Sequence, residues 1–187
     1  MNDAELIRSA RRGDQAAWEA LVRAHQEAAF RLAYLFTGDS DSASDVAQEA
    51  FVRAFQALDR FDMDRSFRPW LMSIVANQAR NQLRSAGRHL SALRRLFQET
   101  PLRDKDAESS MIASWKANTL WKAVRKLDLD DQQVIYYRYF LDLPVSETAS
   151  ALGVAEGTVK SRLHRALDRL KSVIARHYPE LGEGWEA

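Results

Sequence analysis

A basic stretch near the end of the chain, "GVAEGTVKSRLHRAL" (Gly153–Leu167), combines residue types that suit nucleic acid. Read as a helix, it places Val159, Leu163 and Leu167 on one apolar side. The opposite side carries only cationic and hydrogen-bonding groups, namely Thr158, Lys160, Ser161, Arg162, His164 and Arg165. Arginine and lysine reach guanine edges or phosphates in a DNA major groove, and serine can bond to either. The alternative for this charge pattern is the solvated face of an ordinary amphipathic helix.

The residues around this stretch favour DNA binding, because they predict a helix-turn-helix. Pro144 suits the first turn of a preceding helix, where its missing N–H costs nothing. Gly153 stands where that helix must stop, in a position that needs positive φ. Val154 follows as a turn hydrophobe, and the second helix is expected to begin near Glu156 and run through Arg169. Gly157 would let a backbone approach this helix closely.

A second candidate nucleic-acid surface lies in the first half of the chain, on a helix expected from about Ser66 to Ala86. Asparagine and arginine recur there at spacings of three and four residues, at Asn77, Arg80, Asn81, Arg84 and Arg88. Just ahead, three aromatic residues alternate with arginines, at Phe61, Phe67 and Trp70. Aromatic and arginine side chains suit unstacked bases, and amides can bond to base edges that a duplex hides. Phe67 and Trp70 are expected in the core, whereas Phe61 suits either the core or a base.

A third surface is expected on a helix from about Ser42 to Leu58. One side is apolar, formed by Val46, Ala47, Ala50, Phe51, Ala54, Phe55 and Leu58. The other side mixes acids and amides with an exposed valine and an arginine at its edge: Asp45, Gln48, Glu49, Val52, Arg53 and Gln56. A purely solvated face carries Lys/Glu pairs more often. The mixture therefore suggests a contact with another protein, with an ordinary surface as the alternative.

The composition indicates an all-α protein of two small domains. The 187 residues include only seven glycines and four prolines, and long stretches have helical periodicity. Periodicity is lost between Ser85 and Ser110, which is expected to be a flexible linker, and it returns from Met111 to Tyr178. The expected organisation is a first domain at 1–88, a linker at 89–112, a second domain at 113–178 and a tail at 179–187.

Several functional classes are disfavoured by the sequence. There is no cysteine, which excludes disulfides and thiol catalysis and is compatible with the cytoplasm. The four histidines lack metal-ligand spacing, no nucleophile–base grouping is visible, and neither a cofactor nor a metal is expected. No apolar run is long enough to cross a membrane, and the first residues lack a signal-peptide core. The net charge of +1 argues neither for nor against nucleic-acid binding. Its distribution is uneven, because Arg60–Arg95 holds eight arginines against two aspartates, which suggests faces with different partners.

Four segments together resemble the sigma-70 family of bacterial initiation factors, in its extracytoplasmic-function (ECF) group. They are "GDQAAWEALV", "DVAQEAFVRAFQALDRF", "FRPWLMSIVANQARNQLR" and "GVAEGTVKSRLHRAL", and their order and spacing span both domains. The resemblance implies two helical domains, called region 2 and region 4, and a protein that brings core RNA polymerase to promoters. It implies a non-enzymatic, cytoplasmic protein whose partners are core polymerase, promoter DNA and, as is common in the group, an anti-sigma factor.

The resemblance also implies roles for particular residues. Asp45, Gln48 and Glu49, with Arg53 beside them, would meet the clamp helices of the polymerase β′ subunit. Phe61 and Asn77 would capture a base flipped from the −10 element, and Arg80, Asn81 and Arg84 would follow the opened strand. Thr158, Lys160, Ser161, Arg162, His164 and Arg165 would read the −35 element as duplex. "VIYYRYF" (Val134–Phe140) would be mostly core and contribute to a contact with the β-subunit flap.

Two rival functions stay open on the sequence alone. An ordinary regulator with a helix-turn-helix would share the basic C-terminal helix, but it needs a sensor or receiver domain, and the first 90 residues show no βα alternation. A helical adaptor, or a sigma mimic that titrates an anti-sigma factor, would have no reason to keep a basic recognition helix. A stable complex with core polymerase and promoter-specific transcription would separate these possibilities.

Overall fold

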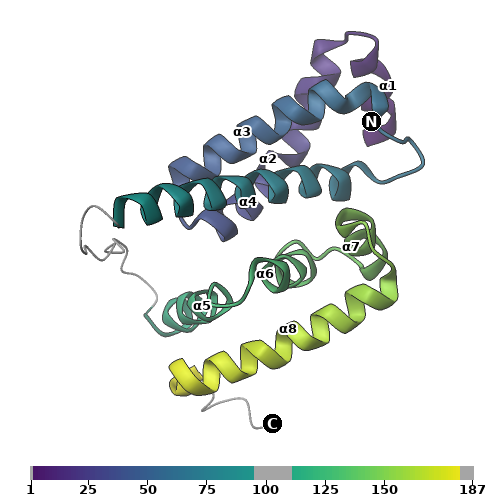
Figure 1. The fold of residues 1–187 in the computed structure, drawn as a ribbon. Helices are drawn as coiled ribbons and strands as arrows, with labels where there is room; N and C mark the ends of the chain where they lie inside the picture. Colours follow the sequence, from purple (N-terminus) through teal and green to yellow (C-terminus); the bar gives the residue numbers. More distant parts are fainter. Residues whose placement is uncertain (1, 95–110, 182–187) are drawn as a thin grey trace.

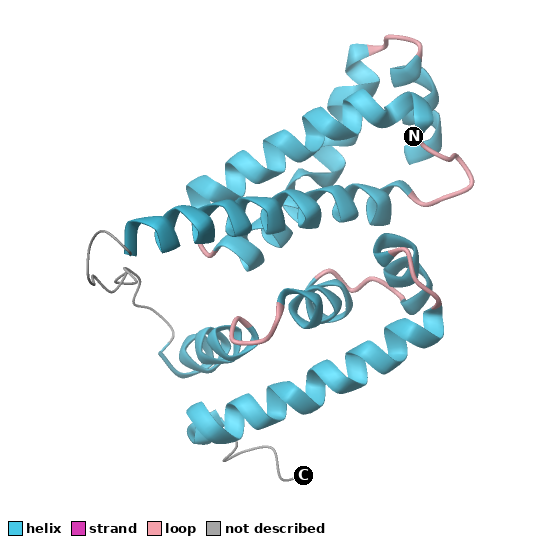
Figure 2. Cartoon of the chain, viewed as in Figure 1, coloured by secondary structure: helices cyan, strands magenta, loops and turns pink. Residues whose placement is uncertain are grey.

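The computed structural model describes residues 2–94 and 111–181, and all the regular secondary structure in these ranges is helical, as predicted (Figure 2). Residues 2–94 form an N-terminal unit and residues 111–181 a C-terminal unit, which lie one above the other in Figure 1. None of the helices in these ranges is long and apolar enough to cross a membrane.

The N-terminal unit is a bundle built around the longest helices. Its elements are α1 (Asp3–Arg11), α2 (Gln15–Thr37), α3 (Ser40–Ala57), the 3₁₀ turn η1 (Leu58–Arg60) and α4 (Phe67–Arg94). Helices α2, α3 and α4 pack against one another, and α1 packs against α2. Fully buried side chains from three helices, including Leu21, Leu32, Phe36, Leu71 and Val75, form the core.

Two Gly-Asp pairs, Gly13-Asp14 and Gly38-Asp39, separate the first three helices. Gly38 ends α2 in the left-handed conformation with φ +74°, and its N–H donates to the Tyr34 carbonyl. Asp14 and Asp39 then cap α2 and α3, because each side chain accepts a backbone N–H from the first turn of the helix that follows. The pairs thus stop one helix and start the next.

The short helix α1 was not predicted from periodicity. Its start is nevertheless encoded locally by a reciprocal cap, in which Asn2 accepts from the Glu5 N–H at 3.0 Å and Glu5 accepts from the Asn2 N–H at 3.2 Å. Leu6 and Ile7 bury its inner side. The N-x-x-E spacing was the signal that would have identified this helix.

The C-terminal unit packs three shorter α-helices against its longest helix. Its members are α5 (Met111–Val124), α6 (Leu129–Ile135), the π-helical turn η2 (Tyr136–Phe140), α7 (Val145–Leu152), α8 (Glu156–His177) and η3 (Pro179–Leu181). Helix α8 contacts α5, α6 and α7. It begins at Glu156 as predicted and continues past Arg169 to His177.

The expected linker is only partly covered by the described residues. Helix α4 runs to Arg94, past the predicted end at Ala86, so residues 89–94 belong to α4. Residues 111 and 112 belong to α5. The rest of the predicted linker, 95–110, and the tail residues 182–187 lie outside the described residues.

The turn η2 of the C-terminal unit is hydrogen-bonded to the N-terminal unit. Tyr136 donates its hydroxyl hydrogen to the Leu35 carbonyl of α2 at 3.0 Å, and Tyr137 donates to the Met72 carbonyl of α4 at 3.1 Å. Both tyrosine side chains are fully buried, whereas Phe140 at the end of η2 is exposed. The expectation that "VIYYRYF" is mostly core is confirmed, and part of that core is the boundary between the units.

Candidate nucleic-acid interface

The turn between α7 and α8 has the geometry of a helix-turn-helix. Gly153 ends α7 with φ +66°, and its N–H donates to the carbonyls of Ala149 and Ser150. The Val154 N–H also returns to the Ala149 carbonyl, at 3.1 Å. Ala155 then precedes α8 and provides no side-chain cap. The positive φ predicted for Gly153 is confirmed, and α8 starts without a side-chain cap.

The apolar side of α8 packs inward. Val159 and Ala166 are fully buried and Leu170 nearly so, while Leu163 is half-buried. This fixes the rotation of the helix about its axis, since the buried side recurs at helical spacing. The residues on the opposite side must therefore face away from the core.

The opposite side, which we call the recognition face, comprises Thr158, Lys160, Ser161, Arg162, His164 and Arg165. Lys160, Ser161, His164 and Arg165 are exposed, and Thr158 and Arg162 are half-buried. Bonds within the helix hold some of these groups: Ser161 donates its hydroxyl to the Thr158 carbonyl at 3.0 Å, and the Arg165 Nε donates to the Ser161 carbonyl at 3.2 Å. The structure thus presents a cationic surface on a helix that can enter a major groove.

Gly157 lies in the first turn of α8 and is exposed. A Cβ added there would meet no heavy atom within 4 Å. The fold itself therefore does not require glycine at this position, and the close approach of a backbone to Gly157 stays a prediction.

On α4 the asparagines and arginines form a second surface, the Asn/Arg ridge, made of Asn77, Arg80, Asn81 and Arg84. Asn77, Asn81 and Arg84 are exposed, whereas Arg80 is half-buried. The side of α4 that faces the core carries Leu71, Val75 and Ala79, all fully buried as predicted. Arg88 lies on the same helix, but its side chain is outside the described residues.

The aromatic residues ahead of α4 form a packed cluster. Phe61 is only 5% exposed. Its ring centroid lies 4.7 Å from that of Trp70 and 5.7 Å from that of Phe67. Arg11 of α1 fixes the loop by donating to the carbonyls of Leu58 and Phe61. The structure thus places Phe61 in the core, so base capture by Phe61 would require this cluster to open.

The predicted protein-contact surface on α3, the α3 stripe, is exposed at Asp45, Gln48, Glu49 and Arg53. The Arg53 Nε donates to Glu49 at 2.8 Å, a pair one helical turn apart. Phe55 differs from its predicted place in the core: it is 53% exposed, beside exposed Val52, and its ring packs on Trp18 with centroids 5.1 Å apart. With Phe55 and Val52 both exposed, this surface is more apolar than predicted.

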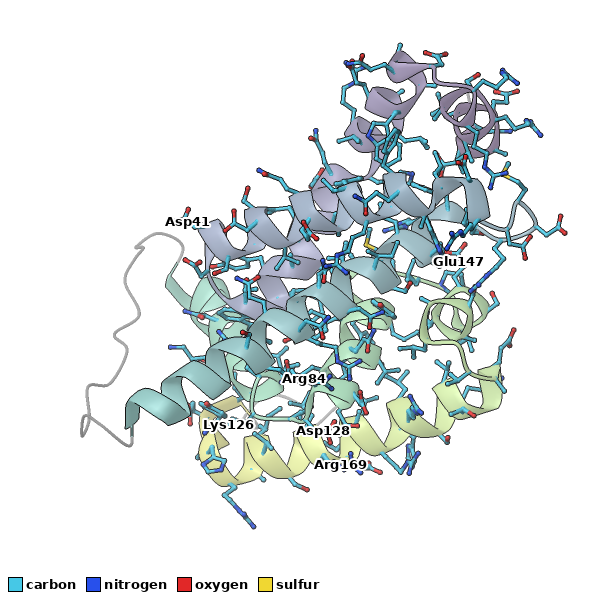
Figure 3. All side chains as sticks on the ribbon, turned by 45° about the horizontal axis from the view of Figure 1, so that its top comes forward. Asp41, Arg84, Lys126, Asp128, Glu147 and Arg169 are labelled. Atoms are coloured by element: carbon cyan, nitrogen blue, oxygen red, sulfur yellow. The ribbon has the colours of Figure 1, made fainter. Side chains whose placement is uncertain are left out.

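The Asn/Arg ridge and the recognition face meet at one cleft, which the sequence analysis did not predict. The cleft has a volume of about 400 Å³ and is lined by Arg80, Arg84, Asp128, Leu129, Asp130, Asp131, Arg162, Arg165 and Arg169. Figure 3 shows Arg84, Asp128 and Arg169 close together between α4 and α8. Burial lowers the pKa of the Arg80 guanidinium from its ordinary value, and nearby Arg84 and Arg162 lower it further.

Ligand-binding chemistry of other kinds has little support in the described residues. Within residues 2–94 and 111–181, no group of three or more His, Asp or Glu side chains is arranged to hold a metal ion. His25 bonds to Asp3 at 2.9 Å, and His164 lies 3.4 Å from Asp168.

Comparison with known proteins identifies the two units. Residues 21–89 match the family Sigma-70 region 2, and residues 117–170 match the family Sigma-70, region 4. The chain is 32% identical over 180 residues to the RNA polymerase sigma-H factor of Pseudomonas aeruginosa, covering 92% of this chain and 93% of that protein. It is 30% identical over 180 residues to the ECF RNA polymerase sigma factor SigW of Bacillus subtilis, covering 90% of this chain and 94% of the relative.

Solved structures have the same fold. The structure of CnrH in complex with the cytosolic domain of CnrY matches with a TM-score of 0.70 and 28% identity, over 94% of this chain and 98% of CnrH. The sigma factor RpoE of Bartonella quintana, solved with the anti-sigma factor NepR, shares the fold with a TM-score of 0.64 and 24% identity, over 84% of this chain and 96% of RpoE. From both family matches, their order and the full-length relatives, we conclude that this chain belongs to the sigma-70 family of RNA polymerase sigma factors, in the ECF group.

Proposed function

We propose that the recognition face of α8 reads the −35 element of a promoter as duplex DNA. The observation that carries this proposal is the exposed cationic side of a helix that follows a Gly153 turn and is held by a buried apolar side. Lys160, Arg162 and Arg165 would contact guanine edges or phosphates, and Ser161 and His164 would add hydrogen bonds. Thr158, at the start of the helix, would contact the DNA backbone.

For the −10 element we propose that the Asn/Arg ridge binds the opened strand. Asn77 and Asn81 are exposed amides one turn apart, suited to the edges of unpaired bases, and Arg84 supplies an exposed cation for the backbone. Trapping an unpaired base offsets an unstacking cost of a few kcal/mol, so this contact favours open DNA. Arg80 would join the ridge once its contacts with the C-terminal unit are released, and Phe61 would join only if its cluster opens.

The α3 stripe is our proposed contact with core RNA polymerase, at the clamp helices of β′. Its mixture of acids, amides and exposed apolar groups suits a protein partner better than solvent alone. Exposed Tyr139 and Phe140 on η2 are our candidates for a contact with the β flap. The domain that makes the β′ contact would comprise α1 to α4, because α1 packs on α2, and the flap-binding domain would comprise α5 to α8.

The proposed partners also include an anti-sigma factor, as is common in the ECF group. Among the relatives, CnrH was solved with CnrY and RpoE with the anti-sigma factor NepR. We propose that the protein works in the cytoplasm, where the polymerase acts, and that it is not an enzyme: it supplies promoter recognition and strand trapping while the polymerase carries out the chemistry.

Run-off transcription with purified core polymerase tests this function. A library of genomic fragments serves as template, and start sites are mapped with and without the protein. We expect a small set of new start sites preceded by a shared pair of elements. A regulator would form no stable complex with core polymerase, and a sigma mimic would bind the anti-sigma factor but produce no promoter-specific transcripts.

A further inference from the structure

Arg80 differs from the other members of the Asn/Arg ridge, because its side chain is already bonded to the C-terminal unit. Its side chain is only 17% exposed. One terminal nitrogen donates to the Gln133 side-chain oxygen at 2.7 Å, and the other pairs with the carboxylate of Asp130. Both acceptors belong to α6. While the two units are packed in this way, Arg80 is unavailable to a DNA strand.

Asp130 is the aspartate of α6 whose pairing crosses between the units. Three aspartates stand at the start of this helix, and two of them form hydrogen bonds only within the C-terminal unit among the described residues. Asp128 caps α6 by accepting the backbone N–H groups of Asp130 at 3.1 Å and Asp131 at 2.9 Å. Asp131, with an 8% exposed side chain, pairs with Arg169 of α8. The Asp130 carboxylate is 68% exposed, and within the described residues its side chain is paired with Arg80.

Other arginines of the same basic segment contact the C-terminal unit. Arg65 donates to the carbonyl and the hydroxyl oxygen of Ser150, both at 2.9 Å. Arg68 donates to the Leu141 carbonyl at 2.9 Å. Arg65, Arg68 and Arg80 thus all bond to acceptors of the C-terminal unit. Part of the arginine excess in this segment is therefore already bonded within the chain before any DNA is present.

The position of Asp130 matches the place that a strand must take. It lines the cleft together with Arg80 and Arg84 of the ridge and with Arg162 and Arg165 of the recognition face. A carboxylate and a phosphate both bind guanidinium through charge-assisted hydrogen bonds to oxygen. A strand that follows Arg80 and Arg84 must replace the Asp130 carboxylate with a phosphate.

We propose that the first turn of α6 mimics a DNA phosphate: Asp130 holds Arg80 in the free protein, and promoter DNA must displace it. The interaction restrains the DNA-binding activity of the free chain and is lost when the two units separate. This inference rests on the proposed role of Arg80 in strand binding, so the experiment tests the two separately.

The test uses the full chain with Asp130→Asn, which keeps the shape of the side chain and removes its charge. Glu180→Gln, an exposed acid of η3, is the matched control for the change in net charge. The probe is a fluorescein-labelled, mixed-sequence single-stranded 20-mer, followed by anisotropy at low salt. Exposed ion pairs contribute up to about 1 kcal/mol, so Asp130→Asn should bind roughly three- to fivefold more tightly than Glu180→Gln.

A double-mutant cycle with Arg80→Gln assigns the effect to this pair. In the Asp130→Asn background Arg80 is free, so adding Arg80→Gln to Asp130→Asn should weaken binding. If the double variant binds as tightly as Asp130→Asn, the proposed strand role of Arg80 is wrong. If the double variant binds more weakly than Asp130→Asn but Asp130→Asn binds no more tightly than Glu180→Gln, the mimicry is wrong.

A distance measurement checks the packing of the two units directly. The chain has no native cysteine, so spin labels can be attached at Gln26→Cys in α2 and Lys171→Cys in α8, both exposed positions. In electron–electron resonance, adding the single-stranded 20-mer should shift the distance distribution towards longer separations, at a lower DNA concentration for Asp130→Asn than for Glu180→Gln. The same DNA dependence in both variants would overturn the inference.

Discussion

The hydroxyl of Tyr137 donates to the backbone carbonyl of Met72, 65 positions earlier in the chain, at 3.1 Å, and both side chains are fully buried. Tyr137 also accepts a hydrogen bond from the Gln133 amide at 2.9 Å. Its neighbour Tyr136 is equally buried and bonds to α2. Two buried tyrosine hydroxyls, which are neutral in the folded protein, therefore form hydrogen bonds across the boundary between the two units. Burial raises the pKa of both hydroxyls well above the ordinary value of about 10.

These tyrosines predict a loss of stability at alkaline pH. The folded protein keeps both phenols protonated, whereas the unfolded chain releases their protons near pH 10. Their contribution is therefore complete below pH 10 and declines as the pH rises further, by up to about 1.4 kcal/mol per pH unit for each tyrosine. Urea unfolding between pH 8 and pH 11 measures it. Tyr137→Phe should reduce the slope above pH 10, and exposed Tyr139→Phe should leave it unchanged.

Gly153→Ala should destabilise the helix-turn-helix through the backbone alone. A Cβ at Gly153 would meet no heavy atom within 4 Å, but φ is +66°. The left-handed conformation costs an alanine roughly 1–2 kcal/mol. Thermal unfolding followed by circular dichroism measures this loss. A melting temperature equal to that of the wild type would show that the turn adopts another conformation in solution.

Gly157→Ala should have opposite effects on stability and on DNA binding. Alanine in the first turn of α8 should stabilise the fold by up to about 1 kcal/mol, because glycine is the poorer helix former and the site is open. If DNA backbone approaches this position, the added methyl should weaken −35 binding by the polymerase complex severalfold. Footprinting on a mapped promoter checks the second effect, and unchanged affinity would assign Gly157 no role in close approach.

Arg165→Glu should impair recognition of the −35 element. Arg165 is exposed on α8, and a base or phosphate contact of this kind is worth about 1–3 kcal/mol. We expect at least a tenfold loss in promoter binding by the polymerase complex. Lys171→Glu, an exposed reversal of the same size farther along α8, is the control. Equal losses from both variants would indicate a general charge effect in place of specific readout.

Asn77→Ala should reduce promoter opening while largely preserving the closed complex. The exposed amide of Asn77 is placed to hold an unpaired base, which exists only after strand separation. Permanganate reactivity of −10 thymines should fall, and closed-complex affinity should change less than twofold, within about 0.4 kcal/mol. Gln26→Ala removes an exposed amide from α2 and controls for the substitution itself. Equal thymine reactivity in the two variants would contradict the role of Asn77.

Local patterns of the sequence predicted most of the helices and the turn of the helix-turn-helix. Helix periodicity and the glycine that ends α7 each act over a few residues, so their effect can be predicted without knowing the rest of the fold. The sign of the charge on each surface could be predicted in the same way, since the recognition face and the Asn/Arg ridge contain no acidic residue. The α1 helix was missed because its signal was a cap and not a long periodic stretch.

Burial, by contrast, was decided by segments far apart in the chain. Phe61 is in the core because α1 and the start of α4 enclose it, whereas Phe55, on the apolar side of α3, is 53% exposed beside Trp18. Arg80 looks like every other cation of its ridge in sequence, yet its partner Gln133 lies 53 positions away. The sequence by itself determined the helices and the charges they carry, since both depend on near neighbours. Only the tertiary structure decided which of these charges faces solvent and which is already paired, because that depends on how the two units pack together.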